Sequence, residues 1–243
     1  MYDVRFKNPS SFLLAGASQS GKTTFTFNLL RNIHLLFEKP ECRQHVIYFY
    51  NQEQDGFELF AKEEIVHAWV NALPSLAEIE SRTARFKSTG GCVVVIDDFA
   101  DEVNKETLTM FTQKCHHNNF VLILLSQNIF CQNPWFRPIS LNSTYVVMFK
   151  NPRDASQISC FAKQFAPGGV SWVVNAFRDA TRRPHSYLLF DSHQQTPDVL
   201  RIRSNIMPHE LPVRVYMEKS STPGNVHIQQ PPLPPVEEEQ REE

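Results

Sequence analysis

A chain of 243 residues that is 42% hydrophobic is long enough to bury a full core, so we expect one main domain with appendages. Every apolar run is shorter than the ~18 residues of a membrane helix, the N-terminus lacks the apolar stretch of a signal peptide, and the five scattered cysteines form no C-x-x-C pair. These features exclude membrane-spanning and disulfide-stapled secreted classes and indicate an intracellular protein with reduced thiols. The formal charge of −2 divides into −4 in the last eight residues and +2 in the rest, which is too weakly basic to indicate nucleic-acid binding by itself.

Apolar, β-branched runs alternate with helical patterns along the chain, which is typical of an α/β fold with a mainly parallel sheet and helices on both faces. We expect strands at 12–15, 44–50, 92–97, 120–126 and 144–149, followed by a late β-hairpin of 186–190 and 199–202. We expect helices at 23–37, 56–71, 75–87, 101–117, 154–165 and 170–181. The run FVLILLS at 120–126 is apolar throughout and is therefore expected at the centre of the sheet.

The alternating pattern ends near Pro208. We therefore expect a folded domain of residues 1–207 and a disordered tail of residues 208–243, which is proline-rich and then acidic. The tail either is passive, which we prefer, or docks a partner that recognises its PPLPP segment.

The octet GASQSGKT at 16–23 fits G-x-x-x-x-G-K-[ST], the phosphate-binding P-loop of nucleoside triphosphatases. An apolar run precedes it and a helical pattern follows, as phosphate binding requires, because backbone N–H groups and the helix N-terminus surround the anion. Lys22 is expected to reach the β- and γ-phosphates of ATP, and the Thr23 hydroxyl to ligate Mg²⁺. The expected nucleotide-binding residues are Gly16, Ala17, Ser18, Gln19, Ser20, Gly21, Lys22, Thr23 and Thr24.

Two further strands end in polar residues that suit the same site. Asp97 closes the run VVVID and is expected to be the second Mg²⁺ ligand. Asp98 follows it, and we expect it to orient or deprotonate the attacking water; the alternative is that it caps the next helix. Gln127 follows LILLS at the carboxyl edge of the sheet, where it either senses the γ-phosphate and positions water or merely begins a loop.

With GASQSGKT, VVVIDD and LILLSQ in this order, the chain resembles the FtsK–HerA superfamily of P-loop ATPases, in particular the DNA-packaging ATPases of Maverick/Polinton elements and related viruses. The closer likeness rests on the segments SQNIF and FKNPRD, within a resemblance that spans about residues 6–181. It implies that the strand ending at Gln127 lies between the P-loop strand and the Asp97 strand. It also implies a homo-oligomeric ring of five or six subunits that drives double-stranded DNA through its centre.

Such rings need an arginine from the neighbouring subunit, and several members carry it on the helix before the glutamine strand. This chain has His116 and His117 there, so we assign the role to Arg137 or Arg153, although Arg153 also suits a structural position at a helix start. We interpret the histidines as surface or nucleotide-adjacent residues and not as zinc ligands. Arg178, Arg182, Arg183, Arg201 and Arg203 form either a solvated face, which we slightly prefer, or a track for DNA.

These features together predict an ATPase that couples hydrolysis to the packaging of viral DNA into a capsid. Its partners would be double-stranded DNA and capsid proteins, with no membrane. It would act at a nuclear or cytoplasmic site of capsid assembly or be associated with the virion. One alternative is a P-loop kinase of a small molecule, against which stands the absence of a basic lid segment in the sequence. Another is a nucleotide-dependent switch or scaffold without turnover.

Overall fold

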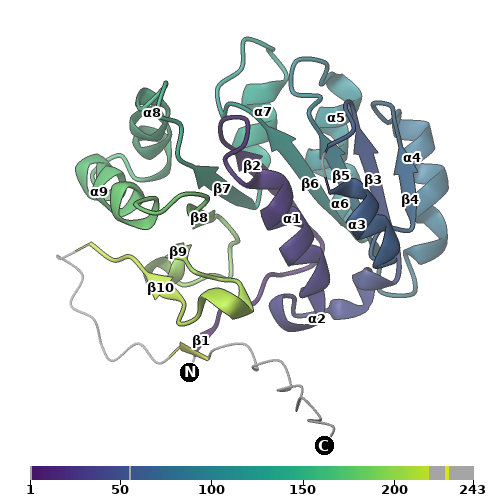
Figure 1. Ribbon diagram of the computed structural model, residues 1–243, viewed down its shortest axis with the longest axis horizontal. Coiled ribbons are helices and arrows are strands. Elements are labelled where there is room, and N and C mark those ends of the chain that lie inside the picture. Colours follow the sequence, from purple (N-terminus) through teal and green to yellow (C-terminus); the bar gives the residue numbers. More distant parts are fainter. Residues whose placement is uncertain (1, 55, 219–227, 230–243) are drawn as a thin grey trace, which may run out of the picture.

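The computed structural model describes residues 2–54, 56–218 and 228–229, which form an α/β fold around a nine-stranded sheet (Figure 1). The strand order is β10-β9-β8-β7-β2-β6-β5-β3-β4. The strands are β2 (Ser10–Ala15), β3 (Val46–Tyr50), β4 (Ala68–Val70), β5 (Cys92–Asp97), β6 (Phe120–Ser126), β7 (Tyr145–Phe149), β8 (Tyr187–Asp191), β9 (Ile202–Ser204) and β10 (Arg214–Val215). A separate parallel pair joins β1 (Tyr2–Asp3) to β11 (Ile228–Gln229).

The sheet confirms the predicted fold class. Parallel pairing runs from β7 through β2, β6, β5 and β3 to β4, and β8 and β9 form the late antiparallel hairpin. Strand β6 lies between the P-loop strand β2 and the Asp97 strand β5, as the resemblance implied, with Ala15 beside Ser126 and Asp97 beside Leu125. The carboxyl ends of these three strands therefore meet at one edge of the sheet, which we call the carboxyl edge.

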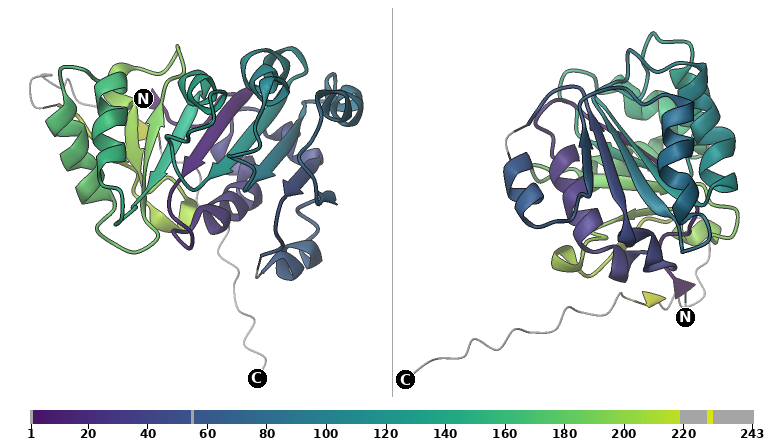
Figure 2. Two further views of the ribbon diagram at one scale, coloured as in Figure 1. Left: turned by 90° about the horizontal axis from the view of Figure 1, so that it is seen from above. Right: turned by 90° about the vertical axis from the view of Figure 1, so that its right-hand side faces the viewer.

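Helices cover both faces of the sheet, as the views from above and from the side show (Figure 2). One face packs against α1 (Lys22–Arg31), α2 (Ile33–Leu36) and α3 (Phe57–Lys62). The other packs against α4 (Leu76–Thr83), α5 (Lys105–Thr109), α6 (Cys115–His117), α7 (Phe136–Asn142), α8 (Ser156–Phe165) and α9 (Val170–Ala180). Successive strand residues face opposite sides, so Phe12 and Leu14 of β2 enter one core and Leu13 and Ala15 the other. This two-sided burial explains why the central strands are uniformly apolar.

Short helical turns complete the described elements: η1 (Pro40–Gln44), η2 (Ala84–Phe86), η4 (Asp198–Leu200) and η5 (Pro208–Glu210) are 3₁₀ turns, and η3 (Met110–Lys114) is a π turn between α5 and α6. Within the described ranges, even the longest helix, α9 with 11 residues, falls short of what a bilayer crossing requires.

Three expected helices differ from the structure. The helix expected at 23–37 is interrupted at Asn32, between α1 and α2. The one expected at 56–71 ends at Lys62, because Ala68–Val70 pairs with β3 and Trp69 packs on Phe57. The one expected at 101–117 begins only at Lys105, because the Asn104 side chain accepts hydrogen bonds from two backbone N–H groups and caps the helix there.

The described chain continues past residue 207, where the sequence places the end of the folded domain. Turn η5 and strand β10 follow, β10 pairs with β9, and Val213 is buried. Residues 219–227 and 230–243, which include the PPLPP segment and the acidic end, lie outside the described residues. The expected division into domain and tail therefore stays a prediction.

Candidate active site

The P-loop connects β2 to α1 at the carboxyl edge, and two of its glycines are required by the local geometry. A Cβ on Gly16 would lie 2.6 Å from Phe149 Cβ, so the close approach of β7 leaves no room for a side chain. Gly21 has φ +102°, a left-handed conformation that glycine adopts at little cost, and it starts α1. The loop therefore turns sharply enough to direct the N-terminus of α1 into the cleft above the sheet.

Lys22 and Thr23, the two P-loop side chains expected to bind ATP and the metal, both form hydrogen bonds with other groups of this chain. Lys22 Nζ donates to Gly16 O at 2.6 Å and to Ala17 O at 3.0 Å, so it lies folded back over the loop. Burial lowers the pKa of Lys22, whereas the charges of Asp97 and Asp98 raise it, which places both carboxylates near this ammonium group. Thr23 Oγ1 donates to Gln54 Oε1 at 2.7 Å.

Asp97 ends β5 and is 3% exposed, so its carboxylate has little contact with bulk water. Tyr48 OH donates to its Oδ2 at 2.7 Å, and Gln54 Nε2 donates to the same oxygen at 3.0 Å. Burial raises the pKa of Asp97 to about 6, and the hydrogen bond from Tyr48 partly opposes this rise. Asp97 is therefore ionised at neutral pH, as a metal ligand must be, but at a cost in desolvation.

Asp98 and Gln127 lie together at the ends of β5 and β6. Gln127 Nε2 donates to Asp98 Oδ1 at 3.2 Å, and Asp98 has φ +64°, which is uncommon for a residue with a side chain. The alternative role of Asp98 as a helix cap is not observed, because the next helix, α5, begins only at Lys105 and is capped by Asn104. A strained acidic residue held by an amide at the mouth of a cleft suits a functional role.

A cleft of about 1080 Å³ opens over the carboxyl edge and unites most of the predicted site. Its expected residues are Ser18, Gln19, Ser20, Gly21, Lys22, Thr23, Thr24, Asp97, Asp98 and Gln127. Gly16 and Ala17 do not line it; Gly16 instead borders a second cavity of about 570 Å³ beneath the loop, between β7, α8 and α9.

A second wall of the cleft comes from late segments that the sequence did not assign to the site. They are the turn from Arg183 to Tyr187, which enters β8, and residues around η5 from Asn205 to Leu211. His185 belongs to this wall, has φ +62°, and lies with its Cβ 3.1 Å from where a Gly21 side chain would begin. Strand β8 is antiparallel to β7, so its first residues return to the carboxyl edge beside the P-loop.

Four residues expected at or near the site lie elsewhere in this chain. Arg137, on α7, and Arg153, in the turn before α8, do not line the cleft and are exposed. His116 and His117 are exposed and lie just before β6, at the opposite edge of the sheet from Gln127, so they are surface residues far from the cleft of their own subunit.

The five arginines considered as a DNA track do not form one surface. Arg203 is 1% exposed; its guanidinium donates to Asp191 Oδ2 at 2.6 Å and to Val4 O at 2.8 Å, so it is neither solvated nor available to DNA. Arg201, at the start of β9, lies toward the opposite edge and pairs with Asp198 at 2.7 Å.

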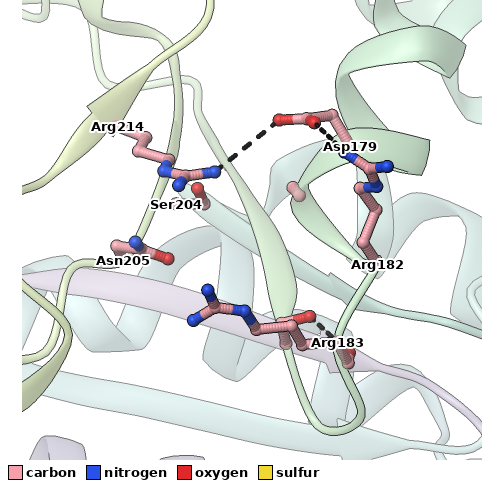
Figure 3. Close-up of a pocket in the computed structure, with 8 residues that line it drawn as sticks. Asp179, Arg182, Arg183, Ser204, Asn205 and Arg214 are labelled. Carbon is pink, nitrogen blue, oxygen red and sulfur yellow. Dashed lines mark hydrogen bonds and ion pairs between the residues drawn. The ribbon is translucent and has the colours of Figure 1, made fainter.

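Arg182 and Arg183 instead meet Arg214 of β10 around a cavity of about 320 Å³ beside the cleft (Figure 3). We call this cavity the arginine pocket. Arg182 and Arg214 each lie 3.8 Å from a carboxylate oxygen of Asp179, and the figure shows both guanidinium groups directed at that carboxylate. Within the described ranges, the Arg183 guanidinium has no acidic partner, so the pocket carries more positive than negative charge. Arg183, Ser186 and Asn205 line both the pocket and the cleft, which makes the two contiguous.

The residues of the cleft fit a nucleotide with its metal. The Ser20 hydroxyl is buried in the loop with no hydrogen-bond partner among the described residues, as expected of a group placed to meet a phosphate oxygen. A threonine hydroxyl and an ionised carboxylate are oxygen ligands of the kind that Mg²⁺ takes. Thr23 and Asp97 would therefore hold Mg²⁺, and the loop and Lys22 would hold the triphosphate.

Sequence reasoning missed Tyr48 and Gln54, the side chains that contact the expected metal ligands. Tyr48 lies within an apolar strand, so its hydroxyl gave no separate signal. The polar run NQEQ at 51–54 directly after β3 was such a signal, because β3 neighbours β5 and polar residues at the carboxyl ends of adjacent parallel strands converge.

Comparisons with known proteins agree with this fold. The structure is similar to the genome packaging NTPase B204 from Sulfolobus turreted icosahedral virus 2 in complex with ATPγS, with a TM-score of 0.52 and 15% identity over 86% of this chain and 96% of that chain. The same protein in complex with AMPPCP gives a TM-score of 0.51 and 14% identity over 86% and 97%. At these low sequence identities, the structural similarity establishes a shared fold.

No curated protein sequence matches the chain. The protein family described as the poxvirus A32 protein matches residues 2–134, a stretch that contains the P-loop, Asp97, Asp98 and Gln127. Because this match covers more than half of the sequence, the chain belongs to the poxvirus A32 protein family.

Proposed function

We propose that this protein is an ATP-driven motor that packages a viral double-stranded DNA genome into a capsid. One observation carries the proposal: in a fold shared with a genome packaging NTPase, the P-loop, Asp97 and the Asp98–Gln127 pair line one cleft. Membership of the A32 family supports it. Such a protein would act where capsids assemble in the infected cell, in the nucleus or the cytoplasm, and could remain in the virion.

Each residue of the site has its own role in ATP hydrolysis. Lys22 leaves the Gly16 and Ala17 carbonyls and, together with the loop N–H groups, binds the β- and γ-phosphates. Thr23 and Asp97 would hold Mg²⁺, which when bound would neutralise the phosphate charge that develops during transfer. Asp98 orients the attacking water and accepts its proton, and Gln127, which contacts Asp98 at 3.2 Å, responds to the presence of the γ-phosphate.

We further propose that the active form is a ring of five or six subunits of the FtsK–HerA type, as the resemblance to Maverick/Polinton ATPases suggests. Arg137 and Arg153 are exposed and lie outside their own cleft, which is what an arginine acting on a neighbouring subunit requires. Such a group stabilises transition-state charge and contributes about 10³-fold or more to the rate.

The arginine pocket is the candidate DNA contact. Among the described residues, the Arg183 guanidinium has no acidic partner, and the pocket adjoins the cleft through Arg183 itself, so a DNA phosphate bound there would be adjacent to the nucleotide. Double-stranded DNA and capsid proteins are the partners that packaging implies.

The decisive experiment measures ATP hydrolysis with and without double-stranded DNA, with Lys22→Ala as the blank. We expect DNA to stimulate turnover, and the stimulated rate per subunit to rise with protein concentration as rings form. Hydrolysis that is indifferent to DNA, or full activity in Lys22→Ala, would contradict the proposal. Phosphorylation of a small molecule, or tight ATP binding without turnover, would instead support a kinase or a switch.

A further inference from the structure

The carboxamide of Gln54 joins the two residues that we expect to bind the metal. Its Oε1 accepts a hydrogen bond from Thr23 Oγ1 at 2.7 Å, and its Nε2 donates to Asp97 Oδ2 at 3.0 Å. Gln54 lies 31 residues after Thr23 and 43 before Asp97, outside both motifs. One neutral side chain therefore connects the hydroxyl and the carboxylate that would hold Mg²⁺.

An amide and a cation place opposite demands on the Asp97 oxygen. Mg²⁺ needs oxygen lone pairs at about 2.0–2.1 Å in near-octahedral geometry. The N–H end of an amide carries partial positive charge, and here it points at Oδ2, which also accepts from Tyr48. A divalent cation at this carboxylate would repel the amide donor and compete with it for the same oxygen.

We propose that Gln54 is a metal-responsive positioning residue: its carboxamide holds Thr23 and Asp97 in place of the cation and is released when the Mg²⁺–nucleotide complex binds. This inference rests on the metal site of the proposed function and adds to it the residue that the metal displaces.

The backbone of Gln54 connects this release to α3. Gln54 O accepts a hydrogen bond from Phe57 N at 3.2 Å, at the first residue of α3. The Phe57 ring packs on Trp69 of β4 with centroids 4.7 Å apart, and Phe60 stacks on Phe27 of α1 at 3.5 Å. A displacement of Gln54 therefore reaches the edge of the sheet through aromatic contacts and changes the surroundings of Trp69.

The fluorescence of Trp69 tests the proposal without depending on ATP turnover. Phenylalanine substitutions of Trp135 and Trp172 leave it as the sole tryptophan of the three in the chain. Addition of Mg²⁺ to this protein with a non-hydrolysable ATP analogue, AMPPNP, is expected to change the Trp69 emission. Calorimetry of the same titration gives the Mg²⁺ affinity.

The test compares Gln54→Leu and Gln54→Ala with Gln113→Leu, a matched control at an exposed glutamine that does not line the cleft. Since both Gln54 variants lack the competing amide, we expect them to half-saturate at about 5- to 10-fold lower Mg²⁺ than the parent, with less than half its change in emission. Gln113→Leu should match the parent in both respects.

Unchanged or weaker Mg²⁺ affinity in both Gln54 variants would overturn the proposal, because it would make Gln54 a permanent support of the metal site or a bystander. The measurement uses neither DNA nor hydrolysis. A protein that binds Mg²⁺–AMPPNP as described but is not stimulated by DNA would contradict the packaging function and leave the role of Gln54 standing.

Discussion

Substitution of Asp97 by asparagine should stabilise the fold while it removes the metal site. Asp97 is 3% exposed, and burial raises its pKa from 3.8 to about 6, so the folded protein holds this proton more tightly than the unfolded chain does. A group of this kind costs stability as the pH rises from its unfolded to its folded pKa. With these values the cost is about 3 kcal/mol at pH 7.5 and about 1 kcal/mol at pH 4.5.

Asparagine avoids this cost and can keep the local hydrogen bonds, because Tyr48 and Gln54 both donate to the same oxygen, Oδ2. We therefore expect Asp97→Asn to raise the free energy of unfolding by up to about 3 kcal/mol at pH 7.5 and by about 1 kcal/mol at pH 4.5. Urea denaturation in EDTA measures both, with Asp98→Asn as the control for loss of a neighbouring charge. A variant no more stable than the wild type at pH 7.5, or an equal gain at both pH values, would refute this reasoning.

Three further substitutions probe hydrolysis, stability and DNA contact. Asp98→Asn keeps an acceptor for Gln127 but removes the base, so single-turnover hydrolysis should slow by about 10²-fold or more with ATP binding unchanged; an unchanged rate would remove Asp98 from catalysis. Arg203→Met leaves the buried Asp191 without its partner and should lower the free energy of unfolding by about 3–5 kcal/mol in urea, whereas a loss below 1 kcal/mol would mean that water or other groups compensate. Arg183→Ala should weaken DNA binding and flatten its salt dependence, as measured by fluorescence anisotropy across a salt series, and an identical slope would exclude it as a phosphate contact.

The parts of the fold that follow from local pattern were predictable from the sequence. The central strands β5 and β6 have the predicted bounds, because uniformly apolar runs between polar ends have few other solutions in an α/β chain. Strand β4 was not predictable, since a three-residue edge strand carries no periodicity of its own, and its pairing with β3 outweighs the helical pattern around it.

The residues of the candidate site were likewise predictable only where local pattern places them. Thr23, Asp97 and Gln127 occur at fixed places relative to strand ends, so the motif order predicted that they would share one edge. Gln54 was missed because its contacts join residues 31 and 43 positions away through side chains alone. The burial of Arg203 was missed for a similar reason, since only the fold shows that Asp191 faces it across two antiparallel strands.

The segment that matches the A32 family contains only one of the two walls of the cleft. The wall with the P-loop, Asp97, Asp98 and Gln127 lies within residues 2–134, which the A32 family shares, whereas the wall built from 183–187 and 205–211 lies outside that range. Substitutions in the second wall therefore leave the family-matching segment intact, so the two sides of one cleft can diverge separately.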